Sequence, residues 1–227
     1  MFNGFTQETS EFLWELSFHN ERPWFQEHKE QFERCLNQPF KELARETAEL
    51  MQQRHPETDW QSHASRIYRD ARRLFGRGPY KDHLWFTVKE GADYSQGPMF
   101  WFEIHAAVYS YGLGYFDASP SEMEFFRRSI DANPARFERL AEELEHRKGL
   151  RVGGPEFKRP KGDRGAVINK WYNRRYLYVE SAHDFGGDLL TPELPKKLAA
   201  TYEKLMPLYR YLQEVHQAYG KAQQEKA

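Results

Sequence analysis

A short block of arginines contains the residue types in this sequence that are best suited to chemistry. It runs from Arg66 to Lys81 and reads RIYRDARRLFGRGPYK, with six basic residues and one acidic residue, Asp70. Arginine presents a rigid fork of N–H donors that matches the two oxygens of a carboxylate or phosphate. We therefore expect the forks of Arg66, Arg69 and Arg72 to bind such an anion. Asp70 can hold a neighbouring fork in place before a ligand arrives.

The same block has a second interpretation, a partly buried network of ion pairs that only shapes the fold. Such networks are common, and they are weak evidence for either stability or function. Under the first interpretation, replacing Arg69 abolishes ligand binding; under the second, it unfolds a non-catalytic interaction or scaffold protein. The residues that we assign to ligand binding are Arg66, Arg69, Asp70, Arg72, Tyr80, Lys81 and, from a later basic stretch, Arg159.

The later basic stretch, residues 148–164, has six basic and two acidic residues, although the whole chain has a net charge of −1. Two basic blocks on an otherwise acidic body are typical of a surface that faces an anion, if the fold brings them together. If it does not, each block is a solvated loop. The expected partner is a small anionic ligand. Nucleic acid is a weaker alternative, which a steep dependence of affinity on salt would reveal.

Glu103 and His105 interrupt the aromatic segment MFWFEIHAAVY, residues 99–109. Positions i and i+2 of a strand point to the same side, so the two side chains should lie together. A histidine beside a carboxylate can serve as a general base, which makes this pair the candidate catalytic residues. The alternative, which we favour, is that both satisfy neighbours across the sheet, such as Arg69 or Arg72.

Metal and thiol chemistry find less support. Glu103 and His105 offer only two of the three or more ligands that a metal needs, so no metal site is assigned, and the cofactor is unknown. The single cysteine, Cys35, excludes an internal disulfide and a zinc site built from several thiolates. It lies on the apolar stripe of an expected helix, where thiols are usually inert. Gly112-Leu113-Gly114 lacks the third glycine of a phosphate-binding loop, and we expect a tight turn there.

Hydrophobic spacing predicts an α+β fold, with an antiparallel sheet of a few strands packed by N-terminal, middle and C-terminal helices. Residues 1–220 are expected to form a single domain, and residues 221–227 a frayed tail. The 36 aromatic residues predict a core richer in aromatic than in aliphatic side chains. Helices are expected after Thr6, Pro23, Pro39, the capping box that begins at Ser119, Asn133 and Thr191. Strands are expected at residues 84–89, 99–109 and 176–180, the first two paired as a hairpin.

No stretch approaches the 18 apolar residues of a membrane-spanning helix. The first residues lack the basic run and apolar segment of a secretory signal. With one cysteine in addition, we expect a cytoplasmic protein without a membrane partner. The oligomeric state and the identity of the ligand stay open.

The arginine block resembles the motif R-x-x-R-D-x-R-F-x-x-x-K-x-P-Y-K-x-x-x-G of a bacterial family, the domain of unknown function 2461. The positions that match are Arg66, Arg69, Asp70, Arg72, Pro79, Tyr80 and Lys81. The sequence departs from the motif at Arg73, Arg77 and Trp85. Further similar segments contain Asn20, Arg22, Trp24, Phe25 and Lys29, then Gly112, Gly114 and Pro120, and then Lys158, Arg159, Pro160 and Gly162. The resemblance implies a bacterial protein of this family's fold and brings no activity with it.

Overall fold

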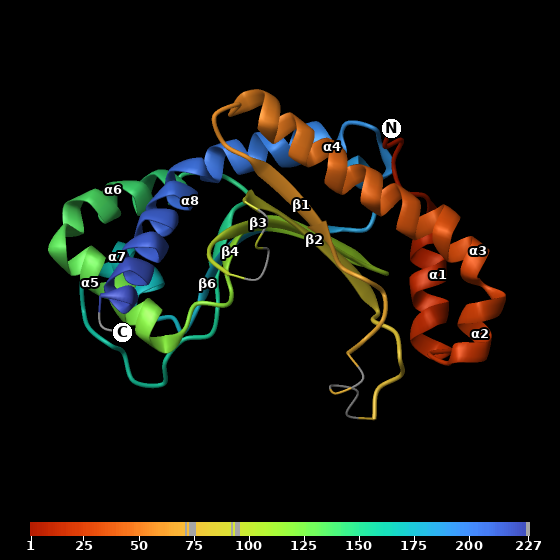
Figure 1. Ribbon diagram of the computed structural model, residues 1–227, viewed down its shortest axis with the longest axis horizontal. Coiled ribbons are helices and arrows are strands. Elements are labelled where there is room, and N and C mark those ends of the chain that lie inside the picture. Colours follow the sequence, from red (N-terminus) through yellow and green to blue (C-terminus); the bar gives the residue numbers. More distant parts are fainter. Residues whose placement is uncertain (71, 73–75, 92, 94–95, 226–227) are drawn as a thin grey trace. The chain divides into compact units, whose positions relative to one another are not determined.

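The computed structural model describes residues 1–225 except 71, 73–75, 92, 94 and 95 (Figure 1). It confirms the α+β class, because helices flank one antiparallel sheet of six strands in the order β1-β2-β3-β4-β6-β5. The strands are β1 (Trp60–Ala64), β2 (His83–Glu90), β3 (Met99–His105), β4 (Val108–Tyr115), β5 (Arg151–Gly153) and β6 (Leu177–Asp184). β1 and β5 were not expected, since each is short and has no clear alternation of apolar residues.

The helices of the first third begin where the sequence predicts. Thr6 is the N-cap of the first helix, and proline lies in the first turn of both the second and the fourth. The single expected helix after Pro23 is divided at His28 and includes a π-helical segment around Cys35. The elements are α1 (Gln7–Phe18), α2 (Arg22–Glu27), α3 (Lys29–Phe32), the π-helix Glu33–Asn37 and α4 (Gln38–Arg54).

The apolar segment 99–109 is not one strand, as the alternation suggested. β3 ends at His105 and β4 begins at Val108, so Ala106 and Ala107 lie between two strands. The expected turn at Gly112 is also wrong, because that residue lies inside β4. A Cβ atom on Gly112 would lie 1.9 Å from the carbonyl oxygen of Val179, so glycine is needed there for close backbone approach rather than for a turn.

The later helices are partly as expected. Ser119 and Glu122 form the predicted capping box, and Asn133 caps the next helix. A helix after the second basic stretch was missed, and Pro207 lies inside the long last helix, which continues to Gln224 into the expected tail. These elements are α5 (Pro120–Ala132), α6 (Pro134–Glu145), α7 (Ala166–Tyr172), the 3₁₀ helix Gly187–Leu190 and α8 (Leu194–Gln224).

The chain divides into two compact units, and each is described by itself. Unit 1 comprises residues 1–92, 101–111 and 182–200, and unit 2 comprises residues 93–100, 112–181 and 201–227. The expectation of a single domain stays a prediction. Among the described residues, no helix is both long enough and apolar enough to cross a bilayer.

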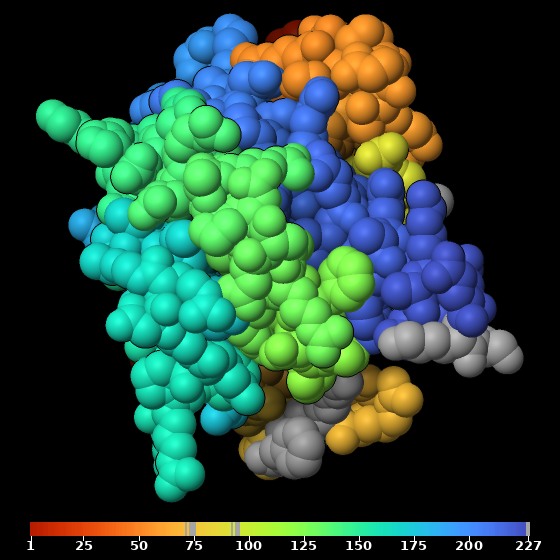
Figure 2. Space-filling view, turned by 90° about the vertical axis from the view of Figure 1, so that its left-hand side faces the viewer, coloured from red at the N-terminus to blue at the C-terminus, as the bar shows by residue number. Residues whose placement is uncertain are grey.

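Both units have the aromatic cores that composition predicted. In unit 1, α4 covers one face of β1 and β2 (Figure 1), and the ring of Phe40 packs edge-on against Phe86 with centroids 5.5 Å apart. In unit 2, α5 and α6 lie against the C-terminal part of α8 (green and blue in Figure 2). There Phe126 and Phe137 meet Tyr211 of α8, with ring centroids 6.3 and 5.2 Å away.

Candidate functional site

The first part of the arginine block is extended and pairs with its last part. The backbone N–H of Arg69 donates to the carbonyl of Pro79 at 2.8 Å, and that of Lys81 donates to Ile67 at 2.7 Å. Tyr68 and Tyr80 form an antiparallel bridge between these two bonds. The two arms therefore continue the pairing of β1 with β2 beyond the end of the regular strands.

Asn20, at the corner between α1 and α2, fastens the second arm. Its side-chain amide donates to the carbonyl of Tyr80 at 3.0 Å and accepts from the N–H of Tyr80 at 2.9 Å. The amide thus occupies both backbone groups of one residue, as a neighbouring strand would. Gly78 leaves room for it, because a Cβ atom there would lie 2.2 Å from the Asn20 Oδ1 atom. Two segments that are 60 residues apart in sequence are joined in this way.

Two of the three expected arginine forks already have protein partners. Asp70 accepts from Arg72 Nε at 3.0 Å and from Nη2 at 2.8 Å, which confirms that Asp70 pins a neighbouring arginine. The Arg72 side chain is 88% exposed, so this pair lies in solvent. Arg69 Nε donates to the carbonyl of Tyr80 at 2.7 Å, and Arg69 Nη2 lies 3.4 Å from Asp82 Oδ1. Arg69 is therefore engaged with the motif's own backbone.

Lys81 lies in a region of excess positive charge. Its ammonium donates to the carbonyl of Arg66 at 2.7 Å and lies 5.7 Å from the centre of the Trp85 ring. Burial and then the charges of Arg69 and Arg66 lower the pKa of Lys81. Burial, Arg66 and Lys81 likewise lower the pKa of His63 on β1. Among the residues that the structure describes, no carboxylate forms an ion pair with Lys81 or Arg66.

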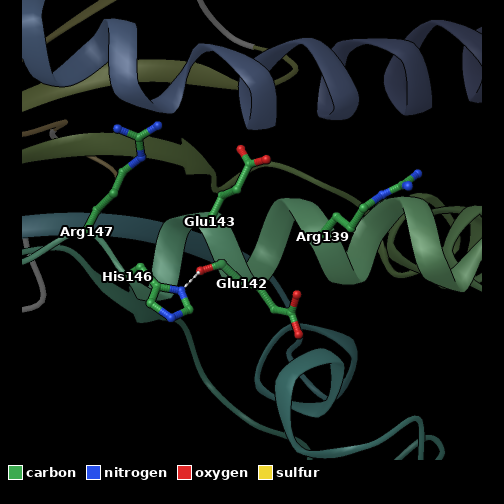
Figure 3. A pocket seen from close by; sticks show the side chains of 5 residues that line it. All are labelled: Arg139, Glu142, Glu143, His146 and Arg147. Atoms are coloured by element: carbon green, nitrogen blue, oxygen red, sulfur yellow. Dashed lines mark hydrogen bonds between the residues drawn. The ribbon is translucent and has the colours of Figure 1, made fainter.

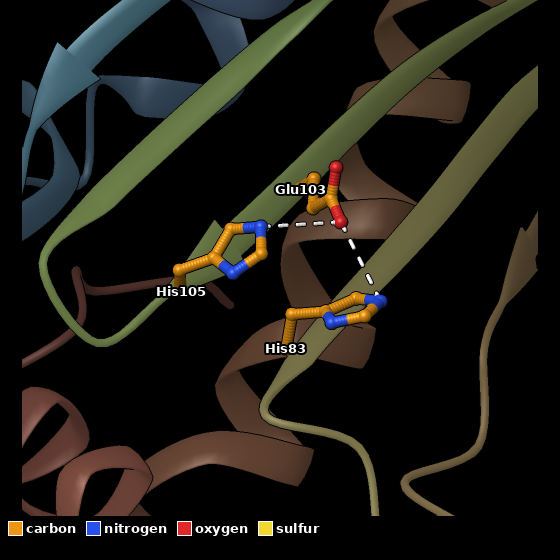
Figure 4. A group of neighbouring side chains, drawn as sticks. All are labelled: His83, Glu103 and His105. Atoms are coloured by element: carbon orange, nitrogen blue, oxygen red, sulfur yellow. Dashed lines mark ion pairs between the residues drawn. The ribbon is translucent and has the colours of Figure 1, made fainter. Parts of the chain in front are cut away.

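Glu103 and His105 lie together, as the strand spacing predicted, and His83 of β2 joins them (Figure 4). The Glu103 Oε1 atom is 3.2 Å from His105 Nε2 and 3.5 Å from His83 Nε2. The two imidazole rings are 5.0 Å apart, centre to centre. The partner of Glu103 across the sheet is therefore a histidine, where we had expected an arginine.

The electrostatics of this cluster favour its charged forms. Burial acts to raise the pKa of Glu103, but the hydrogen bond from His105 and the charges of His83 and His105 outweigh it, so the pKa lies below its usual value. The same hydrogen bond raises the pKa of His105 against the opposing effect of burial. For Asp82, burial is also outweighed, first by the hydrogen bond from His83, and its pKa is lowered.

Asp82 connects the cluster to the arginine block. Its Oδ1 atom is 2.8 Å from His83 Nδ1 and 3.4 Å from Arg69 Nη2. A continuous series of polar contacts therefore runs from Arg69 through Asp82 and His83 to Glu103 and His105. All of these residues belong to unit 1.

His83 and Asp82 are the residues that sequence reasoning missed. The strand was expected to begin at Leu84, one residue after the true first residue of β2. Had it been extended by one position, the alternation would have placed His83 on the same side as Trp85. The alternation along the strand therefore predicts which side His83 faces, but only the pairing of β2 with β3 shows that this side brings it to Glu103 and His105.

Other expected or concave features do not contribute to this cluster. Arg159 is exposed and belongs to unit 2, whereas the other assigned residues belong to unit 1. Arg73, one of the departures from the motif, lies outside the described residues. A shallow depression of about 500 Å³ lies along α6 (Figure 3). It is lined by Arg139, Glu142, Glu143, His146 and Arg147.

Asn20 and the arginine block lie in segments in which the sequence resembles a known family, and a comparison with family profiles agrees. Residues 8–211 match the family described as conserved hypothetical protein, DUF2461. The chain belongs to the DUF2461 family. A search of curated proteins finds no match. Within this DUF2461 protein, Asn20, Arg69 and Tyr80 are among the residues that carried the resemblance, and hydrogen bonds join both Asn20 and Arg69 to the backbone of Tyr80.

Proposed function

We propose that this DUF2461 protein binds a small ligand bearing a phosphate or carboxylate group, at the cationic patch formed by Arg66, Lys81 and His63. The observation that carries the proposal is the state of Lys81. Its ammonium is half-buried, burial and then the charges of Arg69 and Arg66 lower its pKa, and among the described residues no carboxylate neutralises it. A bound anion would relieve that repulsion and would gain charge-assisted hydrogen bonds.

The remaining assigned residues take supporting roles in the proposal. Arg69 adds positive charge, and its fork is held by Tyr80 and Asp82. Asp70 and Arg72 form an ion pair that is exposed to solvent. Exposed ion pairs contribute only about 0–1 kcal/mol, so the pair can separate at small cost and leave Arg72 free to contact a ligand. Arg159 stays a predicted contributor from the second basic stretch.

Glu103 and His105 supply any acid-base chemistry on the bound ligand in this proposal. A carboxylate that orients a histidine is the arrangement that general-base catalysis uses. Support comes from the 3.2 Å contact between Glu103 Oε1 and His105 Nε2 and from their partial exposure, which lets a ligand reach them.

We also propose that the protein is bacterial and lies in the cytoplasm. The support for this is indirect: family membership, and a single cysteine, Cys35, that is buried and free. Nucleic acid remains a weaker candidate ligand, since its phosphates would suit the same patch.

His63 serves as the reporter that tests the proposal. The C–H resonances of the histidine ring are followed by NMR through a pH titration of protein that has been stripped of metal with EDTA, desalted and kept in metal-free buffer. Phosphate, pyrophosphate, a nucleotide and citrate are added in turn. An anion bound between Arg66 and Lys81 cancels their charges, so we expect the pKa of His63 to rise toward its ordinary value and the melting temperature to increase.

Matched charge variants locate the effect. In Arg66→Gln and Lys81→Gln, the ligand-induced change in the pKa of His63 should be lost. Arg54→Gln removes an equal charge at the end of α4 and should respond like the parent protein, because the charges that shift the pKa values of His63 and Lys81 are those of Arg66, Lys81 and Arg69. If no anion moves the pKa of His63 or the melting temperature, the proposal is wrong. Oligonucleotide binding that does not weaken with salt would remove the nucleic-acid alternative.

The scaffold interpretation is the second candidate, and Arg69 favours it. Its Nε–H satisfies the buried carbonyl of Tyr80 at 2.7 Å, which is a structural use of a motif residue. Because Asn20 also donates to this carbonyl, Arg69→Ala removes one of its two hydrogen bonds, and a bond of this kind contributes about 0.5–1.5 kcal/mol. Arg69→Ala therefore separates the candidates: a scaffold role predicts loss of folding stability with no anion response to lose, while a binding role predicts a folded protein that no longer responds to anions.

A further inference from the structure

We infer that His83, Glu103 and His105 form a binding site for one divalent transition-metal ion. Each side chain offers one ligand atom, and these three atoms all lie within 4.8 Å of one another. The residues come from neighbouring strands β2 and β3, whose backbones fix their positions better than a loop would. The inference goes beyond the proposed anion site and does not require it.

Two of the three separations between the ligand atoms match the edge of a tetrahedral coordination shell. Metal–nitrogen and metal–oxygen distances for zinc are about 2.0–2.2 Å, so two ligands at a tetrahedral angle lie about 3.4 Å apart. The Glu103 Oε1 atom lies 3.2 Å from one imidazole nitrogen and 3.5 Å from the other. Figure 4 shows both rings turned toward this same oxygen.

The tautomer of His83 favours a cation between His83 Nε2 and Glu103 Oε1. Asp82 lies 2.8 Å from His83 Nδ1, and because a carboxylate only accepts hydrogen bonds, the proton belongs on Nδ1. In a neutral ring, Nε2 then presents a lone pair to Glu103 Oε1, another acceptor, at 3.5 Å. Two acceptors at this distance repel unless a positive charge lies between them. A metal ion supplies that charge, and its only rival is a second proton on His83.

Asp82 also supplies the outer support that metal-binding histidines commonly have. Such histidines donate their second ring N–H to a carboxylate or carbonyl, which fixes the tautomer and raises the basicity of the ligand nitrogen. Asp82 does this for His83 and is itself held by Arg69 at 3.4 Å. Asp82 is thus a positioning residue, since it contacts His83, which would bind the metal, and does not reach the metal position itself.

The ligand set indicates the kind of metal. Two imidazoles and one carboxylate suit zinc, iron(II), cobalt(II) and related ions, whereas magnesium and calcium prefer oxygen ligands. Three protein ligands leave at least one position open, which is the pattern of catalytic sites. The side chains of His83, Glu103 and His105 are 25%, 28% and 38% exposed, so solvent or a ligand can reach that position. With metal bound, a coordinated water would take over the acid-base role.

Cobalt(II) provides the direct test, because its visible absorption reports coordination number and ligand type. Protein freed of metal with EDTA and then desalted is titrated with cobalt chloride, and zinc chloride binding is measured by calorimetry. We expect one equivalent to bind, with an absorption spectrum typical of four- or five-coordinate cobalt, and a millimolar magnesium background should not compete. The anion assay uses metal-free protein in metal-free buffer, so failure of one proposal leaves the other intact.

Variants assign the site. His83→Ala, Glu103→Gln and His105→Ala should each weaken cobalt binding at least about 100-fold, and far-ultraviolet circular dichroism verifies that each is folded. His146→Ala is the matched control, because that histidine directly follows α6 in unit 2 and its Nδ1 lies 2.7 Å from the carbonyl oxygen of Glu142 (Figure 3). Asp82→Asn should keep the stoichiometry and weaken binding about 10–100-fold.

Three results would overturn the inference. The first is the absence of saturable binding at one equivalent. The second is binding that the three ligand variants leave unchanged, which would indicate adventitious sites among the other histidines. The third is an NMR titration in which His83 carries protons on both ring nitrogens with stoichiometric zinc present, since the second proton would then occupy the metal's place.

Discussion

The amide of Asn20 should contribute measurably to the stability of the motif, because it satisfies both backbone groups of a buried residue. Tyr80 is 1% exposed, so neither its N–H nor its carbonyl can turn to water when Asn20 is truncated. A neutral hydrogen bond contributes about 0.5–1.5 kcal/mol net, and an orphaned buried group costs about 1–3 kcal/mol. Arg69 still donates to the Tyr80 carbonyl, which leaves mainly the N–H orphaned. We therefore expect Asn20→Ala to lower the free energy of unfolding by about 2–3 kcal/mol.

Combining Gly78→Ala with Asn20→Ala gives a double-mutant cycle that tests this expected loss of stability. The Cβ atom of Gly78→Ala would lie 2.2 Å from Asn20 Oδ1 and 2.4 Å from the Asn20 carbonyl oxygen. The single change must therefore displace the amide from Tyr80. Once Asn20 is alanine, one of the two clashes and both hydrogen bonds are already gone. The double variant should be less destabilised than the sum of the single variants, by at least about 1 kcal/mol.

The assay is urea unfolding followed by tryptophan fluorescence and by circular dichroism. For a chain of this length, about 2–3 kcal/mol corresponds to a fall of roughly 5–10 °C in melting temperature. Asn3→Ala, which removes an exposed amide of the same type, should stay within about 0.5 kcal/mol of the parent. Strict additivity of Asn20→Ala and Gly78→Ala would refute the reasoning, and so would an Asn20→Ala variant as stable as the control.

Two further predictions concern titratable groups in unit 1. Burial, followed by the negative charge of Glu8, raises the pKa of Cys35 to about 12, so Ellman's reagent should react with it slowly in the native state and immediately in denaturant; rapid native reaction would contradict its burial. The pKa of His63 is lowered from 6.5, first by burial and then by Arg66 and Lys81, so the neutral ring is favoured in the folded state. The resulting stability is present above pH 6.5 and is lost as the pH falls through the folded pKa. His63→Gln should therefore lose less stability than the parent between pH 7.5 and 5.5, as measured by urea midpoints, and an unchanged difference would count against this assignment.

The sequence predicted most where local chemistry decides the structure. Thr6, Pro23 and Ser119 marked helix starts correctly, because capping and proline geometry depend on a few neighbouring residues. The hairpin between β3 and β4 was missed because apolar alternation continues through the Ala106–Ala107 connection. Gly112 was misread as a turn residue because its true reason, the approach of the Val179 carbonyl from β6, is 67 residues away in sequence and has no local signal.

Only part of the candidate site could be predicted from the sequence. Glu103 and His105 follow from strand spacing alone, and Asp70 was expected to pin a neighbouring arginine, which it does with Arg72. The third member, His83, depends on which strand lies beside β3, and a single sequence does not state strand pairing. Composition showed that the arginine block was basic, but it could not show which of its side chains have partners.

Asp82 links the arginine block to the histidine cluster, because it contacts a residue of each. One carboxylate oxygen lies close to both Arg69 Nη2 and His83 Nδ1, so the two donors compete for it. Any event that draws Arg69 away strengthens the hold of Asp82 on His83, and with it the basicity of the nitrogen that faces Glu103. An anion that binds beside Lys81 attracts Arg69 electrostatically, because the charge of Arg69 is among those that lower the pKa of Lys81. The geometry therefore provides a physical route by which occupancy of the cationic patch would tighten the cluster, through a single oxygen atom and without a change of fold.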